Sequence, residues 1–357
     1  MTSTISKNTI PNTMSGIVLT EHGDTDKLHY RDNLSVPTLT NHDVLIRVSA
    51  AGVNNTDINT RLAWYSKKEA DSSDASWSGH ALSFPLIQGA DVCGTIVAVG
   101  GKVNPNRIGE RVLIEPCLQE IDSEKLNPAG YFGSECNGGF AEYTKVADRH
   151  AYAIKSHLSD IELASFPCSY STAENMLSRA NVNERDRILI SGASGGVGSA
   201  AIQLAKARGA YVVAITSADK RQALLDIGAD QALTREDDIV AALGESSIDV
   251  VIDLVAGQQW PVFLEVLKPF GRYAVSGAIG GAFVELDVRT LYLKDLSLFG
   301  CTVLAPDVFG NLIRYLEQGK IKPLVAHTYP LKEIVQAQEA FQKKNHLGKI
   351  VLTVTQS

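Results

Sequence analysis

The hydrophobic pattern of the chain changes near residue 160. Before that point, short apolar runs are separated by Gly, Pro and Asn, which is typical of strands joined by turns. The stretches 66–84 and 116–138 lack this pattern, and we predict loops there. The first part is therefore predicted to be rich in β-structure. Its predicted strands cover residues 16–19, 43–48, 94–100, 111–114 and 141–146.

After residue 160, helical and strand patterns alternate along the chain. Alternation of this kind predicts a parallel sheet with helices on both faces. The predicted helices cover residues 161–165, 171–180, 200–207, 219–227, 307–318 and 331–343. The predicted strands cover residues 187–190, 211–215, 249–253, 272–275, 297–300 and 348–352.

A glycine-rich turn lies between the predicted strand 187–190 and the predicted helix 200–207. Its small residues occupy the three small positions of the G-x-G-x-x-G fingerprint, which let the backbone approach a dinucleotide pyrophosphate. The start of the following helix offers free N–H groups and a positive dipole end to the phosphates. We therefore predict that this turn binds a dinucleotide. The predicted cofactor-binding residues here are Ala193, Ser194, Gly195, Gly196, Val197 and Gly198.

The residues that follow the next strand favour NADPH over NADH. An NAD site usually carries Asp or Glu at this strand end, where it holds the ribose 2′-hydroxyl. Here Thr216 and Ser217 are neutral donors and Lys220 is a cation, a set suited to a 2′-phosphate. Asp219 lies a few residues past the strand end. The alternative is that Lys220 lies only on the solvated face of the next helix.

Composition narrows the class of protein. The chain has 357 residues, 45% of them hydrophobic, and a net charge of −7 without a basic block. That size predicts two domains, and the charge gives no reason to expect nucleic acid or an anionic membrane as a partner. No apolar run approaches the roughly 18 residues of a membrane span. The polar segment 1–14 is predicted to be a flexible arm, and five scattered cysteines favour the cytoplasm.

Five short motifs carry a resemblance to a known family. They are Gly-Val-Asn-Asn-Thr-Asp at 52–57, Gln-Gly-Ala-Asp-Val-Cys-Gly at 88–94, the glycine turn at 191–198, Asp-Ile-Gly-Ala-Asp at 226–230 and Gly-Lys-Ile-Val-Leu at 348–352. With them the chain resembles the medium-chain dehydrogenase/reductase superfamily, and within it the zinc-independent quinone oxidoreductase (zeta-crystallin-like) branch.

The resemblance implies an α/β protein with two domains. A GroES-like β-barrel domain that holds the substrate would cover residues 15–158 and 306–357, and a Rossmann NADP-binding domain would cover 159–305. The segment 299–302 matches a region where strands of two Rossmann domains often pair. A homodimer is therefore implied as well.

The metal positions of the resemblance decide the expected chemistry. Zinc alcohol dehydrogenases of this superfamily use Cys, His and Cys as ligands, and Asn54, Ala90 and Cys168 stand on the matching positions here. Catalytic zinc needs three N, S or O ligands from the protein, which this set does not supply. The segment 116–138 also holds only two of the four cysteines of a structural zinc lobe. We predict no metal.

Without a Lewis acid, hydride is expected to go to an acceptor that spreads charge by conjugation, such as a quinone or an α,β-unsaturated carbonyl. The predicted catalytic residues lie in one segment. Asn54 replaces a zinc ligand and could donate to the substrate oxygen, and Thr56 stands where zinc enzymes have a relay hydroxyl. Arg61 and Tyr65 match the quinone reductase pattern, whose first tyrosine is Asn59 here. Structural alternatives are an ion pair of Arg61 with Asp57 and a loop-anchoring role for Tyr65.

The resemblance adds further residues beside the cofactor. Thr172 resembles a hydroxyl that lies near the nicotinamide ring, and Val255, Ser276 and Gly277 match segments that flank the ribose and nicotinamide. Lys349 could reach the cofactor or cap the last strand.

Two other functions stay open at this point. One is a zinc-type alcohol dehydrogenase with a displaced metal site that uses Asp91 and Cys168. The other is a non-catalytic NADPH-binding or RNA-binding protein, because relatives of this branch include crystallins.

Overall fold

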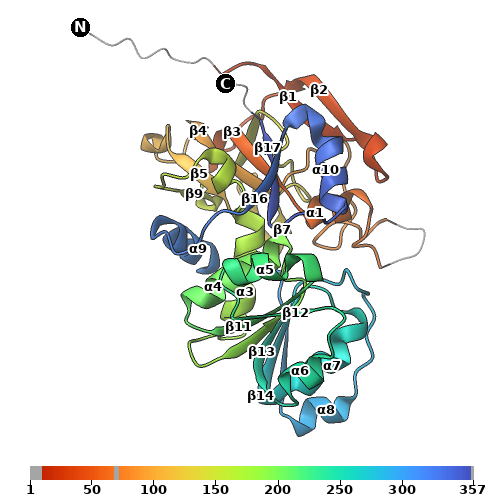
Figure 1. The fold of residues 1–357 in the computed structure, drawn as a ribbon. Helices are drawn as coiled ribbons and strands as arrows, with labels where there is room; N and C mark the ends of the chain where they lie inside the picture. The colour runs from red at the N-terminus through yellow and green to blue at the C-terminus, as the bar shows by residue number, and fades with distance from the viewer. Residues whose placement is uncertain (1–9, 68–71, 355–357) are drawn as a thin grey trace.

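The computed structural model describes residues 10–67 and 72–354, and Figure 1 shows two layered parts above and below a central waist. The predicted arm 1–14 falls largely outside the described residues, which exclude 1–9. Its last two residues already belong to a strand, because β1 begins at Thr13 and the Met14 side chain is buried in the core. The first strand therefore starts earlier than the polar composition predicts.

The lower part contains the predicted parallel sheet. All five pairings between its neighbouring strands are parallel. The expectation of a Rossmann-like α/β fold is confirmed, although β12 had not been predicted as a strand. In spatial order the strands are β12 (Gln231–Thr234), β11 (Tyr211–Thr216), β10 (Arg187–Ile190), β13 (Ile248–Asp253), β14 (Leu267–Val275) and β15 (Ser297–Gly300).

The central strand β10 shows why this sheet needs helices on both faces. Its side chains alternate between the two faces, as strand geometry requires. Ile188 and Ile190 pack in one hydrophobic cluster, and Leu189 packs in another. The helices that accompany this sheet in the described chain from residue 160 to 300 are α3 (Pro167–Arg179), α4 (Gly196–Ala207), α5 (Arg221–Asp226), α6 (Ile239–Leu243), α7 (Trp260–Val266) and α8 (Val288–Leu293). The short helix α2 (Asp160–Leu163) packs instead against strands of the upper part.

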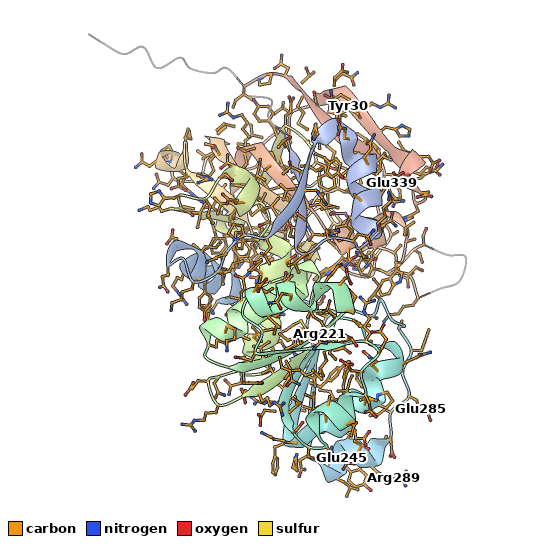
Figure 2. All side chains as sticks on the ribbon, viewed as in Figure 1. Tyr30, Arg221, Glu245, Glu285, Arg289 and Glu339 are labelled. Atoms are coloured by element: carbon orange, nitrogen blue, oxygen red, sulfur yellow. The ribbon has the colours of Figure 1, made fainter. Side chains whose placement is uncertain are left out.

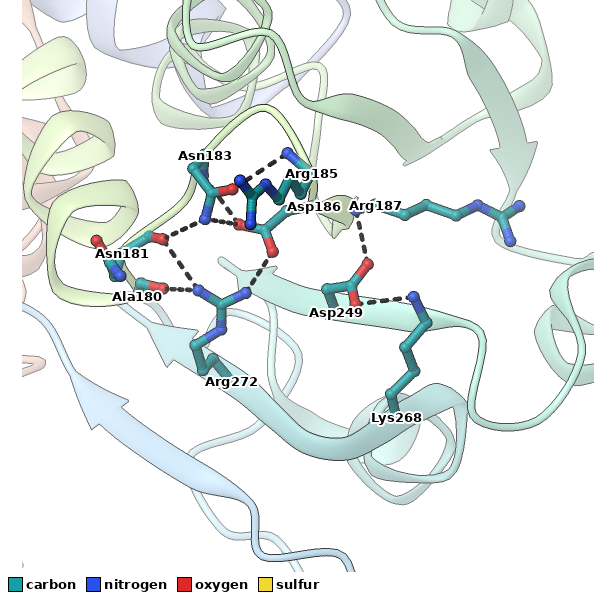
Figure 3. A network of polar contacts seen from close by, with 9 residues as sticks. All are labelled: Ala180, Asn181, Asn183, Arg185, Asp186, Arg187, Asp249, Lys268 and Arg272. Atoms are coloured by element: carbon teal, nitrogen blue, oxygen red, sulfur yellow. Dashed lines mark hydrogen bonds and ion pairs between the residues drawn. The ribbon is translucent and has the colours of Figure 1, made fainter.

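A polar network holds the edge of this sheet where β10 and β13 begin (Figure 3). Arg272 donates to the carbonyl oxygens of Ala180 at 2.7 Å and Asn181 at 3.0 Å, and pairs with Asp186. Asp249 accepts from the backbone of β10 at 2.8 Å and pairs with Lys268 at 2.8 Å. We call these residues the amino-edge network, since the glycine turn lies at the opposite ends of the strands.

The upper part is built on a seven-stranded sheet. Its last strand in sequence, β17, lies between β16 and β3 and returns the chain to the first part. In spatial order the strands are β16 (Val325–Pro330), β17 (Lys349–Thr353), β3 (Asp43–Val53), β4 (Asp91–Val99), β5 (Arg111–Ile114) and β9 (Ala151–Ala153), with β8 (Tyr143–Ala147) also paired to β3. The accompanying elements are β1 (Thr13–Leu19), β2 (Leu28–Ser35), α1 (Asn55–Arg61), α9 (Val308–Glu317) and α10 (Ile334–Gln342).

The prediction of a loop at 116–138 is wrong for most of its length. Strands β6 (Cys117–Ile121) and β7 (Glu124–Tyr131) form an antiparallel hairpin there. The two residues between them, Asp122 and Ser123, have φ of 52° and 68°. Two consecutive residues in the left-handed region are typical of a two-residue hairpin turn. The short polar residues Asp122 and Ser123 are the sequence signal that could have predicted this hairpin turn, and the hydrophobic pattern alone did not reveal it.

Charged side chains project from the surface of both parts (Figure 2). Glu339 lies on α10 in the upper part, and Glu245, Glu285 and Arg289 lie at the lower end. Within the described ranges, none of the helices has the length and apolar character that a membrane crossing requires.

Candidate active site

The glycine turn has the geometry of a phosphate-binding loop. Gly192 has φ of +57°, and a methyl group on Gly198 would lie 2.4 Å from the Gly192 carbonyl oxygen. Ala193 is buried and donates its N–H to Ile215 of β11 at 3.1 Å. Helix α4 begins directly after this turn without a side-chain cap. The N–H groups of its first turn therefore have no partner within the helix and point at the turn.

The loops that follow β13 and β14 meet the same edge. Asp253 accepts from the Ser191 hydroxyl and from the N–H of Val255 at 2.9 Å. The Ser276 N–H donates to the Asp253 carbonyl at 3.1 Å, and a methyl group on Gly277 would lie 2.6 Å from a carbonyl of the Val255 loop. The structure thus brings the predicted cofactor residues of three strand ends together.

The end of β11 gathers positive charge. Thr216 is buried, and its hydroxyl has no hydrogen-bond partner among the described residues. Ser217 is half-buried beside it. Lys220 is half-buried, and its ammonium donates to the carbonyls of Lys344 at 2.5 Å and His346 at 3.1 Å. Burial and nearby cations lower the pKa of Lys344 to about 8. Sequence reasoning missed Lys344, which follows the predicted helix 331–343.

Asn54 is buried at the start of α1, where its amide is fully engaged. Its Nδ2 donates to Asp91 at 2.9 Å and to the Gly52 carbonyl at 3.4 Å, and its Oδ1 accepts from Lys349. The amide N–H groups are therefore already used inside the protein. Burial raises the pKa of the neighbouring Asp57 to about 7, although the Asn54 backbone N–H donates to its carboxyl at 2.8 Å.

Thr56 and Tyr65 form a pair of hydroxyl groups. The Tyr65 hydroxyl donates to Thr56 Oγ1 at 3.2 Å. Both side chains are partly exposed, and burial raises the pKa of Tyr65. Because Thr56 accepts this bond, its own proton is available to a further acceptor.

Arg61 lies apart from these residues. Its side chain is fully buried and contacts Gly23 O at 2.7 Å, Asp24 at 3.3 Å and Gln338 at 3.1 Å. The suggested ion pair with Asp57 is wrong, since Asp24 is the partner. The position of Arg61 on α1 turns its side chain toward α10 and the β1–β2 connection.

Asp91 is the centre of a buried cluster. Its carboxylate accepts from Lys349 Nζ at 2.8 Å and from the Cys168 backbone N–H at 2.6 Å, in addition to Asn54. The Cys168 thiol lies 3.0 Å from the Tyr131 hydroxyl, and burial raises the thiol pKa to about 12. The Lys349 side chain therefore passes Gly196 of the glycine turn and reaches Asp91. Thr172, one turn along α3, is half-buried and donates to the Cys168 carbonyl at 2.8 Å.

Two family models match the chain: the alcohol dehydrogenase GroES-like domain over residues 40–156 and the zinc-binding dehydrogenase over 196–318. A quinone oxidoreductase of Lama guanicoe is 30% identical over 353 residues, covering 95% of this chain and 97% of that protein. An acryloyl-coenzyme A reductase of Metallosphaera sedula is 31% identical and covers 76% and 84%. The solved structure of a candidate alcohol dehydrogenase from Sinorhizobium meliloti 1021 is 44% identical, with a TM-score of 0.90 and 98% of each chain covered.

The chain belongs to the medium-chain dehydrogenase/reductase superfamily, in its quinone oxidoreductase-like branch. It is an oxidoreductase of a family that uses a nicotinamide cofactor. The carboxyl edge fits such a cofactor on three observations. The glycine turn has no room for a methyl group at Gly198. The start of α4 offers N–H groups that have no partner in the helix, and the buried Thr216 hydroxyl lacks a partner among the described residues.

The donor set of this medium-chain oxidoreductase does not fit catalytic zinc. Asn54, Ala90 and Cys168 supply an amide, a methyl group and one thiol. Across residues 10–67 and 72–354, no three His, Cys, Asp or Glu side chains come together in a group suited to a metal ion. A displaced site on Asp91 and Cys168 would have two protein ligands, of which the carboxylate already holds an ammonium.

A separate cavity of about 570 Å³ lies in the upper part of the protein. Its lining includes Asp43, Glu120 and Lys145 and none of the predicted site residues.

Tyr131 belongs to the buried cluster around Asp91 and Cys168. Sequence reasoning missed it because it lies in the segment 116–138, which was predicted to be a loop. Trp77 packs on its ring with centroids 4.9 Å apart.

Proposed function

We propose that this reductase uses NADPH to reduce a quinone or the conjugated double bond of an α,β-unsaturated carbonyl, without a metal in the reaction. The observation that carries the proposal is the Thr56–Tyr65 hydroxyl pair, which lies on the segment where the family's substrate chemistry is expected. The names of two relatives, a quinone oxidoreductase and an acryloyl-coenzyme A reductase, agree with conjugated acceptors.

The cofactor would supply hydride when bound, and the chain would hold and orient it. The N–H groups at the start of α4 would bind the pyrophosphate. Thr172 and the loops at Val255, Ser276 and Gly277 would flank the nicotinamide and its ribose.

The substrate oxygen gains negative charge when hydride reaches a conjugated acceptor, and hydrogen-bond donors stabilise that charge. Asn54 has no N–H left for this role, because both are used inside the protein. Thr56 is the donor that the geometry favours, with Tyr65 donating to it from behind. A proton lost from Thr56 would be replaced from Tyr65.

The choice of NADPH is supported by charge at the end of β11. Among the described residues no carboxylate lies within ion-pair distance of Lys220 or Lys344, and Asp219 acts on Lys220 only from farther away. Arg235 and Lys349 add to the positive charge around these two lysines. An extra phosphate on the adenosine ribose would neutralise this charge, and a ribose hydroxyl would not.

The first experiment identifies the product that chelator-treated protein makes from NADPH and an α,β-unsaturated aldehyde. A saturated aldehyde is expected. An unsaturated alcohol would show carbonyl reduction and contradict the proposal. Bound NADPH without turnover of enals or quinones would favour a non-catalytic cofactor-binding protein.

Substitution of the hydroxyl pair tests its role. Thr56→Val should lower kcat/KM by about 10²-fold, the lower end of the range for a group that transfers a proton. Tyr65→Phe should cost about 2- to 10-fold, the value of one neutral hydrogen bond. Tyr30→Phe, on the outer surface (Figure 2), is the matched control and should have no effect. Equal activity of Thr56→Val and wild type would contradict the assignment.

The cofactor preference is tested at Lys220. Lys220→Ala should lower kcat/KM for NADPH roughly 10- to 100-fold, the value of a hydrogen bond to a charged group, with little change for NADH. Lys206→Ala, which removes a surface lysine of α4 that pairs with Asp230, is the control. A similar loss with both cofactors would assign Lys220 a structural role.

We also propose that the protein is a homodimer joined at β15, and that it works in the cytoplasm. β15 is the edge strand of the parallel sheet, and apolar side chains are exposed around it, including Leu298, Leu293 and Phe283. Exposed apolar patches next to an open strand edge mark contact surfaces. Leu298→Arg should convert the dimer to a monomer in light-scattering measurements, whereas Leu62→Arg on the upper part should not.

A further inference from the structure

A polar pocket of about 370 Å³ lies away from the candidate active site, where the helices α3, α4 and α9 meet. Helix α9 packs on α3 at this place, and Figure 1 shows it beside α3 and α4. The described residues that line the pocket include one carboxylate, Glu174 of α3. They also include three cations, which are Arg208 at the end of α4, Arg314 of α9 and Lys320. The pocket therefore has an excess of positive charge.

The Glu174 side chain is buried in the wall of this pocket, with one oxygen bonded and the other free. The residue is 1% exposed. Its Oε1 accepts from Arg208 Nη2 at 2.7 Å and from the Ser178 hydroxyl at 3.3 Å. Its Oε2 has no hydrogen-bond partner among the described residues. Burial raises the pKa of this carboxyl, which shows that its contacts within the protein do not fully compensate its charge.

Arg208 leaves a free donor beside this free acceptor. Its Nη2 serves both Glu174 and Ser178, whereas its Nη1 is buried without a partner in the part of the chain that the structure describes. Buried polar atoms in native proteins almost always have a partner. A ligand that completes this ion pair would donate to Glu174 Oε2 and accept from Arg208 Nη1.

The two other cations of the pocket lie at its exposed rim. Arg314 donates to the neutral Asn311, and Lys320 lies 5.7 Å from the centre of the Tyr315 ring. Over residues 10–67 and 72–354, no carboxylate lies within ion-pair distance of either of them. A second acidic group on the ligand would therefore meet uncompensated positive charge at the rim.

We propose that this pocket binds an acidic α-amino acid. The ligand ammonium donates to Glu174 Oε2, its α-carboxylate accepts from Arg208 Nη1, and its side-chain carboxylate faces Arg314 and Lys320. Arg208 follows the last turn of α4, and the glycine turn lies at the other end of this helix, about 18 Å away for 12 residues. The amino acid and the dinucleotide can thus be bound together, and the inference does not depend on the substrate of the reaction.

Calorimetric titration of the full chain with L-glutamate and with glutarate, which lacks the ammonium, tests the proposal. Wild type should bind L-glutamate at least about 10-fold more tightly than glutarate, since only the ammonium can donate to Glu174. Glu174→Gln keeps an oxygen for Arg208 and turns an N–H toward the ligand. This variant should lose about 10- to 100-fold in affinity for L-glutamate and none for glutarate.

The matched control is Glu317→Gln, which makes the same change of charge at an exposed position of α9 outside the pocket lining. It should bind both ligands like wild type. If Glu174→Gln does not fold, the wild-type comparison of the two ligands still decides, together with Arg314→Ala at the exposed rim, which should weaken both. Absence of saturable L-glutamate binding, equal affinity of wild type for the two ligands, or competition between L-glutamate and NADPH would overturn the proposal.

Discussion

Two ion-pair regions of the protein use the same chemical groups in different surroundings. In the amino-edge network, the Lys268 and Asp249 side chains are 41% and 22% exposed. In the site cluster, Lys349 and Asp91 are almost completely buried. Exposed pairs contribute little to stability, whereas a buried charge that loses its partner is strongly destabilising. Burial, rather than the contact itself, therefore decides what each pair does: one joins strand ends, and the other fixes the charge of the candidate site.

The largest expected effect comes from removing the buried ammonium. Lys349→Met should lower the free energy of unfolding by about 3–5 kcal/mol, because the buried Asp91 carboxylate loses its counter-charge and keeps only the hydrogen bonds from Asn54 and Cys168. Urea denaturation measures this change. The Asp91→Asn/Lys349→Met variant should recover a large part of the loss, and a loss below about 1 kcal/mol in Lys349→Met would contradict the comparison.

An intermediate effect is expected at Arg272, which is more buried than Lys268 and bonds two backbone carbonyls as well as Asp186. Arg272→Gln should lower the unfolding free energy by about 1.5–3 kcal/mol, the value of hydrogen bonds to a charged group. NADPH affinity should stay unchanged, because this network lies at the far edge of the sheet from the glycine turn. Weaker NADPH binding at unchanged stability would reverse the roles of the two edges.

The pH dependence of stability tests the positive charge around the site. Burial and the nearby Lys344, Lys220, His327 and Lys349 lower the pKa of His346 to about 4. From about pH 6.5 down to about pH 4, the unfolded chain binds a proton that the folded chain does not, so stability is lost as pH falls.

His346→Gln removes this contribution. Denaturant titrations should therefore show that the unfolding free energy of the variant rises relative to that of wild type as pH falls from 7 to 5. His157→Gln, an exposed position, is the control. Parallel pH profiles of His346→Gln and wild type would show that the charge around His346 is already neutralised.

The smallest effect is expected for the exposed pair. Lys268→Ala should change the unfolding free energy by about 0–1 kcal/mol and leave kcat unchanged. Added salt should reduce even this difference, because exposed charges are screened. A change as large as that of Lys349→Met would show that exposure is a poor guide to these pairs.

The sequence allowed the glycine turn and its flanking elements to be predicted because their signals are local. Small residues, a strand and a helix follow one another within a short stretch, and each constrains the next. Ser276 and Val255 were placed at the same edge because parallel strands end together. The order of the seven-stranded sheet was not readable, since its neighbours are distant in the chain.

The contacts between the candidate site residues could not be predicted either, because these residues are also distant from one another in the chain. Asn54 was expected to keep a free amide, but Asp91 and Lys349 take its hydrogen bonds. Lys349 belongs to the motif at 348–352, which by itself does not show where the side chain goes. The position of β17 next to β3 directs that side chain to Asp91. Arg61 matched a pattern by spacing, while its contacts depend on α10.

The place of β17 between β16 and β3 has a consequence for biosynthesis. Domains begin to fold while the ribosome is still adding residues. The barrel strands up to β9 can pair early, but Asp91 lacks its cation until Lys349 has been made and has left the exit tunnel. Until then Asp91 stands in the nascent chain without this cation, and the pairing of β17 with β3 both joins the sheet and supplies the charge that faces Asp91.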